Sequence, residues 1–264
     1  MKVLTFDYDM IISFSSPVSK HSFTVKCIPQ SSERQNVRKL DYTIFPDSSL
    51  STGFSTGKDS FGNYCVYGEC DSPHESFEIH VTGEVETGLK TWETGESEHM
   101  LGRYRYPTLY TKPGEQIKVY HKNFEFAELS NLSKSVSMMH MLYDDFSYVP
   151  GATNIGTTAE EALSLGKGVC QDYSHILIAF CHLERIPARY VVGMLAGEGA
   201  SHAWVEIYDG GRWYALDPTN NLIVDSDHIK ISHGRDYQDC LINQGVFTGS
   251  ADQTQKIQVL VAES

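Results

Sequence analysis

The patterning of the chain changes near residue 125, and this change limits the folds that the sequence can adopt. Before that point, short runs alternate between apolar and polar residues, as in residues 23–28, 64–67 and 76–81. Gly, Pro, Asn or Asp bound each run, and residues 59–63 read as a turn, which is typical of strands. No helical period is evident there. The first half therefore predicts an antiparallel, β-sandwich-like domain.

Helical signals begin after this change. Apolar residues recur at a three-to-four spacing from Leu132 to Leu142, and Ser130 is in place to cap a helix. A second, short helix is expected with Thr157 as its N-cap and Glu160 three residues later in a capping box. Gly166 is expected to end it.

The first half is β-rich, and the second half contains both helices and strands. This arrangement predicts an α+β chain of two domains. The length of 264 residues fits this division at about 150 residues per domain. We place the boundary between about residues 120 and 132, which gives a β-rich domain over 1–127 and a second domain over 128–264. Hydrophobic residues at 41% and charged residues at 21% are ordinary for a folded protein.

The charge balance is acidic, because 21 Lys and Arg face 34 Asp and Glu, for a net charge of −13. A nucleic-acid partner would need clustered positive charge, and an anionic membrane surface is disfavoured for the same reason. No run of about 18 apolar residues is present, so no membrane-spanning helix is expected. Asp7 interrupts the start of the chain too early for a secretion signal, so a cytoplasmic location is expected.

The six cysteines are spread too widely for a disulfide scaffold, and they lack the paired spacing of a zinc site. His175 and His182 lie seven residues apart without a carboxylate at metal spacing, so we expect them in the core or in solvent. His228 and His233 show no metal pattern either. No metal and no cofactor is expected.

One cysteine stands where a helix begins. Residues 166–169 include two glycines, and Cys170 follows them at the start of an apolar helical segment. Unpaired N–H groups and the helix dipole at such a position stabilise a thiolate, which is the nucleophilic form. A buried, inert cysteine is the alternative, and position alone weighs the two evenly. Cys181, about three turns into the same helix, is expected to be core.

Two strands after this helix carry a histidine and an aspartate. Residues 201–208 read as one strand, with His202 and Trp204 on the same face. A two-residue turn at Gly210 and Gly211 then places Asp217 opposite Trp204, as a diagonal neighbour of His202. A slip of one residue would separate them. The alternatives are a core histidine and a turn-forming Asp before proline.

The neighbouring large side chains have simpler interpretations. Trp204 and Trp213 are expected to pack in the core, with a substrate cleft as the alternative. Glu206 shares the face of His202 but lies four residues further along the strand, so it is expected outside any catalytic group.

Together, Cys170, His202 and Asp217 form a plausible nucleophilic triad. The thiolate would attack a carbonyl carbon, and His202 would take the thiol proton and return it to the leaving amine. Asp217 would fix the imidazole tautomer and support its positive form. The backbone N–H of Cys170, at the helix start, would hold the oxyanion.

Four segments resemble the bacterial transglutaminase-like cysteine protease family: residues 168–173 (GVCQDY), 186–191 (IPARYV), 201–206 (SHAWVE) and 213–219 (WYALDPT). Residues 234–239 (GRDYQD) also resemble the bacterial branch. The N-terminal half, with DSFGN at its centre, is similar to the β-rich domain that often precedes such a core. The resemblance implies a papain-like core and a triad of Cys170, His202 and Asp217. It also makes Tyr148 a candidate oxyanion donor.

The family includes cross-linkers, deamidases, peptidases and silent scaffolds, so the resemblance leaves the reaction open. We expect a cysteine-dependent acyl transfer on a peptide or protein substrate through a thioester, resolved by water as in a peptidase or amidase. Transglutaminase cross-linking or deamidation of glutamine side chains is the first alternative. A noncatalytic binding module is the second, although such a module does not need all three chemical groups.

Overall fold

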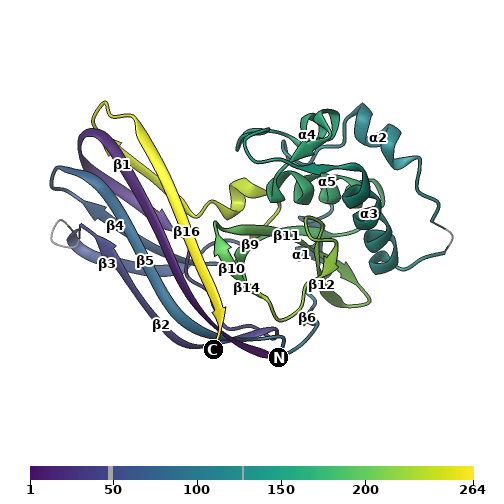
Figure 1. Ribbon diagram of the computed structural model, residues 1–264, viewed down its shortest axis with the longest axis horizontal. Helices are drawn as coiled ribbons and strands as arrows, with labels where there is room; N and C mark the ends of the chain where they lie inside the picture. The colour runs from purple at the N-terminus through teal and green to yellow at the C-terminus, as the bar shows by residue number, and fades with distance from the viewer. Residues whose placement is uncertain (47–49, 127) are drawn as a thin grey trace.

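The computed structural model describes residues 1–46, 50–126 and 128–264. Its chain forms two lobes, one an extended antiparallel sheet and the other a mixture of helices and a second sheet (Figure 1). The helices gather in the second lobe, and both large sheets are antiparallel, so the predicted α+β class is confirmed. No helix in the described ranges is both long and apolar enough to cross a membrane.

The first lobe is built around β1 (Lys2–Val25), which runs through the whole of an eight-stranded sheet. Its first part pairs with β5 and β16, and its last part pairs with β4 and β15. Every second side chain from Leu4 to Ile12 is buried, which is the period of a strand with one face in the core. The other strands are β2 (Gln35–Phe45), β3 (Leu50–Lys58), β4 (Tyr64–Cys70), β5 (His74–Thr87), β10 (Gly197–Gly199), β15 (Asn243–Thr248) and β16 (Gln253–Glu263).

The predicted antiparallel strands of this half are thus present, in one continuous sheet that passes through β1. The turn at residues 59–63 is also present. The carboxylate of Asp59 accepts hydrogen bonds from the backbone N–H groups of Phe61 and Asn63, at 2.8 and 3.0 Å. Lys26 forms an ion pair with the same carboxylate at 2.8 Å. Asp59 therefore holds the turn and ties it to the end of β1.

The chain crosses between the lobes more often than a division at residue 127 suggests. Strands β15 and β16 come from the end of the sequence, yet they pair with β1 in the first lobe. Strand β10, which lies between β9 and β11 in the sequence, pairs with β16. In the other direction, β6 (Trp92–Thr94) pairs with β12 of the second lobe. The division at 127/128 stays a prediction, and residue 127 itself lies outside the described residues.

Two short helices, α1 (Glu98–Gly102) and α2 (Glu115–His121), lie in the half where no helical period is evident. A helix of five or seven residues spans two turns at most, which is too short for an apolar period to show. The carboxylate of Glu160 accepts hydrogen bonds from the N–H groups of Gln116 and Ile117, at 2.6 and 3.2 Å. The start of α2 is therefore capped by a residue distant in sequence, a signal that local patterning does not contain.

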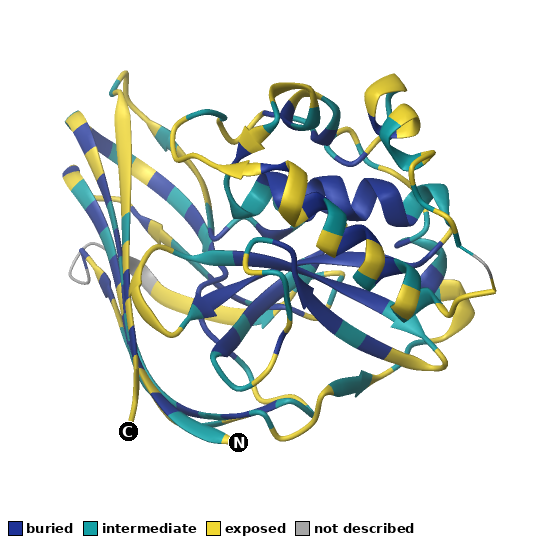
Figure 2. Cartoon of the chain, turned by 45° about the vertical axis from the view of Figure 1, so that its right-hand side comes forward, coloured by how far each residue is buried: buried dark blue, intermediate teal, exposed yellow. Residues whose placement is uncertain are grey.

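The second lobe contains a six-stranded sheet in the order β13-β12-β11-β9-β14, with β6 also paired to β12. Helix α5 (Cys170–Leu183) packs on β9 and β11, and α3 and α4 pack on α5. Figure 2 shows α5 largely in the buried colour, consistent with the unbroken run of buried residues from Asp172 to Cys181. The remaining elements are α3 (Asn131–Asp145), β7 (Ser147–Tyr148), α4 (Ala159–Leu165), β8 (Lys167–Gly168), β9 (Ala188–Leu195), β11 (His202–Asp209), β12 (Arg212–Asp217), β13 (Leu222–Ile223), β14 (His228–Gly234) and the 3₁₀ turn η2 (Tyr237–Cys240).

The helix starts largely follow their predicted caps. Ser130 caps α3 and accepts the N–H of Ser133 at 3.2 Å, as predicted. For α4 the prediction is wrong by one residue, because Thr158 is the cap and Glu161 completes the capping box. Both positions offer a Thr followed by a Glu three residues later, so the sequence alone does not separate them. Gly166 ends α4 in the left-handed conformation, with φ of 65°, as predicted.

Candidate active site

Cys170 is the first residue of α5, and the chain that leads to it is held on both sides. Strand β8 pairs in parallel with β7, which places Gly168 beside Tyr148. The carboxylate of Asp172 accepts hydrogen bonds from the N–H of Val169 and the hydroxyl of Thr153, both at 2.7 Å. A Cβ on Gly168 would lie 2.4 Å from that carboxylate, so the absence of a side chain there lets Asp172 fold back over the helix start.

The two cysteines of α5 lie in different surroundings. Cys170 is half-buried, whereas Cys181 is fully buried and contacts the hydroxyl of Ser135 at 3.7 Å. Burial raises the pKa of the Cys181 thiol to about 12. The prediction that Cys181 is a core residue is therefore confirmed.

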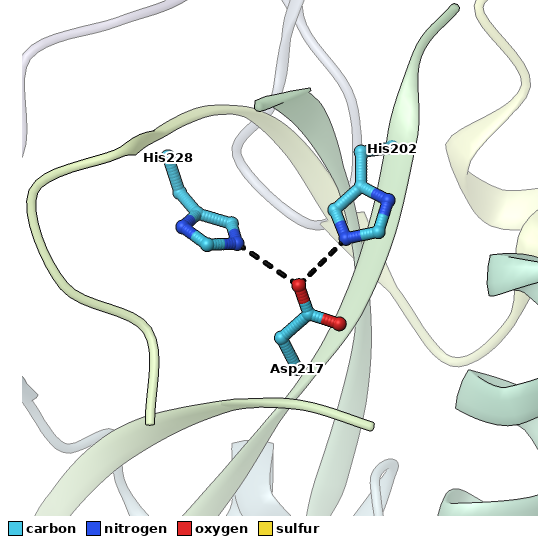
Figure 3. A group of neighbouring side chains, drawn as sticks. All are labelled: His202, Asp217 and His228. Atoms are coloured by element: carbon cyan, nitrogen blue, oxygen red, sulfur yellow. Dashed lines mark hydrogen bonds and ion pairs between the residues drawn. The ribbon is translucent and has the colours of Figure 1, made fainter. Parts of the chain in front are cut away.

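His202 and Asp217 meet as the predicted register requires. Strands β11 and β12 pair Val205 with Leu216 and Asp209 with Arg212, around a turn in which Gly210 and Gly211 have φ of 53° and 85°. His202 Nε2 lies 2.7 Å from Asp217 Oδ2 (Figure 3). Both glycines are in the left-handed region that a two-residue hairpin turn needs. The turn therefore sets the register that brings the imidazole to the carboxylate.

The ring of His202 is shared between the carboxylate and the thiol. Burial alone would lower its pKa, but hydrogen bonds to Asp217 and to Cys170 outweigh that effect and raise the pKa of His202 to about 10. Since Nε2 points to Asp217, Nδ1 is the ring nitrogen left for the sulfur. The raised pKa favours the imidazolium, the form that supports a thiolate beside it.

Five donors converge on the Asp217 carboxylate. The backbone N–H groups of Thr219 and Asn220 donate to Oδ1, at 3.0 and 3.2 Å. The side-chain amide of Asn220 donates to Oδ2 at 2.7 Å, and both His202 and His228 point Nε2 at the same oxygen. Burial would raise the pKa of this carboxyl, but hydrogen bonds from His202 and His228 hold it well below its usual range. Asp217 therefore both shapes the turn and orients the imidazole.

Sequence reasoning missed His228, the first residue of β14. Its Nε2 lies 3.1 Å from Asp217 Oδ2, and its side chain is 1% exposed. The ligand atoms of His202, Asp217 and His228 all lie within 4.8 Å of one another, a spacing that a metal ion could also use. Three N–H donors already converge on Oδ2, so we interpret the group as a hydrogen-bonded carboxylate. Only the pairing of β14 with β9 brings His228 here, and no local signal indicates it.

Tyr148 lies beside the proposed nucleophile. It pairs with Gly168, is 53% exposed, and has a pKa raised by partial burial and by the charge of Cys170. The backbone of Tyr148 thus lies beside the strand that leads into Cys170. Its role as an oxyanion donor stays a prediction.

The other residues singled out in the sequence are buried or half-buried. Trp204 and Trp213 are each 1% exposed, so packing is confirmed for both. Glu206 forms ion pairs with Arg189 at 2.5 Å and with Lys230 at 2.7 Å, so its charge is paired with two basic side chains. His175 and His182, the pair considered as a metal face, make other contacts. The Nε2 of the buried His175 accepts the N–H of Tyr237 at 3.2 Å, and that of the half-buried His182 lies 3.3 Å from the Thr111 hydroxyl.

Comparisons with known proteins match both halves of the chain. The model of the transglutaminase-like superfamily matches residues 121–218, which include Cys170, His202 and Asp217. The model of the bacterial transglutaminase-like N-terminal region matches residues 4–86. The two matches follow each other in the order that the sequence motifs predicted.

Similar whole chains are found in bacteria. An uncharacterized protein of Mycobacterium leprae is 26% identical over 257 residues, with 89% of this chain and 90% of that protein covered. One of Mycobacterium tuberculosis is 29% identical over 267 residues, with 88% and 83% covered. The crystal structure of a candidate cysteine protease from Cytophaga hutchinsonii superimposes with a TM-score of 0.80 at 24% identity, covering 99% of this chain and 90% of that one, and so shares its fold. The chain therefore carries a transglutaminase-like core preceded by a bacterial transglutaminase-like N-terminal region.

Proposed function

We propose that the protein is a cysteine-dependent acyl-transfer enzyme with Cys170, His202 and Asp217 as a papain-like catalytic triad. The observation that carries this proposal is the placement of His202. Its Nε2 lies 2.7 Å from a buried carboxylate, and Cys170, at a helix N-terminus, is one of the groups that raise the pKa of its ring. The match to the transglutaminase-like superfamily supports cysteine-based acyl transfer as the reaction class.

In the proposed mechanism, the Cys170 thiolate attacks the carbonyl carbon of a peptide or amide bond. The imidazolium of His202 gives its Nδ1 proton to the leaving amine, and a thioester to Sγ remains. Water, deprotonated by the now neutral His202, attacks the thioester, releases the acid and restores the ion pair. Asp217 stays ionised throughout, because its strong hydrogen bonds hold the carboxyl pKa well below its usual range.

Charge develops on the carbonyl oxygen during each attack, and the helix start is suited to hold it. The first N–H groups of an α-helix have no partner within the helix, and Cys170 is the first residue of α5. We propose its N–H as one oxyanion donor and the Tyr148 hydroxyl as the second. The helix dipole adds positive potential at the same point.

We propose hydrolysis of a peptide or protein substrate as the primary reaction, in line with the description of the Cytophaga hutchinsonii relative as a candidate cysteine protease. Transglutaminase chemistry uses the same thioester and differs only in the acceptor, a lysine amine in place of water. A silent binding module is disfavoured, because the three groups are brought together from α5, β11 and β12. A cytoplasmic location, and a lack of nucleic-acid or membrane partners, stay predictions from composition.

Incubation with glutamine-containing peptides, with and without a primary amine, tests these proposals by mass spectrometry. Cleaved peptides indicate a peptidase, a gain of about one dalton indicates deamidation, and an amine adduct indicates a transglutaminase. The matched control is Cys170→Ser. Products formed equally by that variant, or no product from the wild type in any arm, would contradict a catalytic Cys170.

A further inference from the structure

We propose that His228 is a positioning residue of the active site, which orients the Asp217 carboxylate and, through it, the ring of His202. This inference rests on the proposed function. His228 and His202 come from different strands, β14 and β11, that lie on either side of β9. Their Nε2 atoms nevertheless point at one oxygen, Asp217 Oδ2, at 3.1 and 2.7 Å (Figure 3).

The orientation of the His228 ring is fixed by packing. The indole of Trp204 stands edge-on to it, with ring centroids 5.2 Å apart and an angle of 80° between the planes. Gly193 makes room for that indole, since a Cβ there would lie 2.4 Å from the Trp204 ring and 2.2 Å from the carbonyl oxygen of Ile229. A ring held in this way presents its N–H to Asp217 without further adjustment.

The polar contacts of His228 point to a role beyond packing. For Nε2 to donate to the carboxylate, the ring must carry a proton there. Its Nδ1 is buried and has no hydrogen-bond partner within the described ranges. A buried polar atom without a partner is unfavourable, so an apolar side chain would fill this space at less cost. The contact that sets a histidine apart from such a side chain is the one to Asp217.

The carboxylate needs this second imidazole because its two oxygens are held differently. Oδ1 is fixed by the backbone N–H groups of Thr219 and Asn220, whereas Oδ2 is held by side chains alone. Loss of the His228 donor leaves Oδ2 with His202 and the flexible amide of Asn220. A displacement of about 1 Å in such an array costs roughly 100-fold in rate.

Two substitutions of His228 distinguish the effect of its hydrogen bond to Asp217 from the effect of the space that its ring fills. His228→Gln keeps an N–H donor at a similar distance from the backbone, and His228→Met fills the space without a donor. The readout is the rate at which iodoacetamide alkylates Cys170 at pH 6, where a thiol without an imidazolium partner is mostly protonated. We expect His228→Met to lower this rate roughly 10- to 100-fold and His228→Gln to stay within about threefold of wild type.

His233→Met is the matched control. His233 lies on the same strand and also has a buried ring nitrogen, Nε2, without a partner, but it does not contact Asp217. We expect this variant to alkylate at the wild-type rate, and His228→Leu provides a second variant without a donor should His228→Met not fold. Thermal melting of each variant shows whether stability changes separately from rate.

The outcomes separate this inference from the proposed function. Fast alkylation of Cys170 in the wild type with an equal rate in His228→Met or His228→Leu overturns the role of His228 alone. That role is also overturned if the Gln and Met variants lose equal rate and equal melting temperature. Slow alkylation of Cys170 in the wild type itself contradicts the activated thiolate, and the role of His228 falls with it.

Discussion

At the scale of single residues, Asp217 combines two tasks that the sequence leaves as alternatives. Its Oδ1 accepts two backbone N–H groups of the turn that follows it, and its Oδ2 accepts the imidazole of His202. The turn thereby fixes the carboxylate before any substrate arrives. Preorganisation of this kind is what a catalytic imidazole needs, because the tautomer and the ring plane must be set together.

Asp217→Asn is expected to remove most of the activity while leaving the fold intact. An amide cannot accept hydrogen bonds at both of its ends, so at least one group of donors loses its partner. We expect Cys170 alkylation at pH 6 and any hydrolysis to fall roughly 100- to 10,000-fold, and stability to fall by about 1–3 kcal/mol. Asp225→Asn, an exposed carboxylate, is the control. An Asp217→Asn rate equal to that of the control would contradict the assigned role.

At the scale of elements, the start of α5 depends on Gly168, whose lack of a side chain leaves room for the carboxylate of Asp172. This carboxylate caps the Val169 N–H and holds the Thr153 loop, so the first turn that carries Cys170 is fixed from both sides. A free N-terminal turn would fray, and a frayed turn neither presents aligned N–H groups nor keeps a thiol against His202.

Gly168→Ala tests this arrangement. The new Cβ would lie 2.4 Å from the Asp172 carboxylate, which must move away from Val169. We expect a loss of about 1–3 kcal/mol in the free energy of unfolding and a several-fold slower alkylation of Cys170. Gly102→Ala is the control, because nothing lies within 4 Å of a Cβ built there. Melting and alkylation of Gly168→Ala that match Gly102→Ala would show that the Asp172 contact is dispensable.

Elements with strong local signals could be predicted, and elements defined by distant partners could not. The apolar period from Leu132 to Leu142 and the Gly210–Gly211 turn are local, so α3 and the β11–β12 register follow from the sequence. His228 and β10 depend on strands far away in the chain, β9 and β16. The contact between His202 and Asp217 could be predicted because both residues lie on one hairpin. The contact between His228 and Asp217 could not be predicted, because β14 enters the sheet from a different loop.

At the scale of the whole molecule, the loops that carry both histidines are fastened to the β-rich lobe. Strand β10 pairs with β16, three residues before His202, and Lys2 forms an ion pair with Asp227 at 2.7 Å, one residue before His228. The Thr87 hydroxyl donates to the carbonyl of Ser226 at 2.5 Å. These contacts show why the first lobe matters to the site: it holds the loops from which the histidines extend.

The molecule also carries histidines that are buried in neutral form, and these predict a loss of stability in acid. Burial lowers the pKa of His175 to about 3 and that of His182 to about 4, and burial with the nearby His74 lowers the pKa of His21 to about 4. Below pH ~6.5 the unfolded chain binds protons that the folded chain does not, so stability falls as the pH decreases from ~6.5 towards the folded pKa values.

His175→Gln is expected to reduce this slope by about 1.4 kcal/mol per pH unit between pH ~6 and ~4.5. Chemical denaturation at several pH values, followed by circular dichroism, measures the slope. His99→Gln, at an exposed position, is the control and should retain the wild-type dependence. An unchanged slope in His175→Gln would mean that this ring gains a proton in the folded state.

The most direct test of the whole account is the rate at which iodoacetamide alkylates Cys170 at pH 6, compared with Cys181 in the same molecules and with Cys170 in His202→Asn. We predict that Cys170 of the wild type reacts at least about 100-fold faster than Cys181 and that the substitution of His202 removes most of this advantage. Equal, slow labelling of both cysteines, or a rate at Cys170 that does not depend on His202, would contradict it.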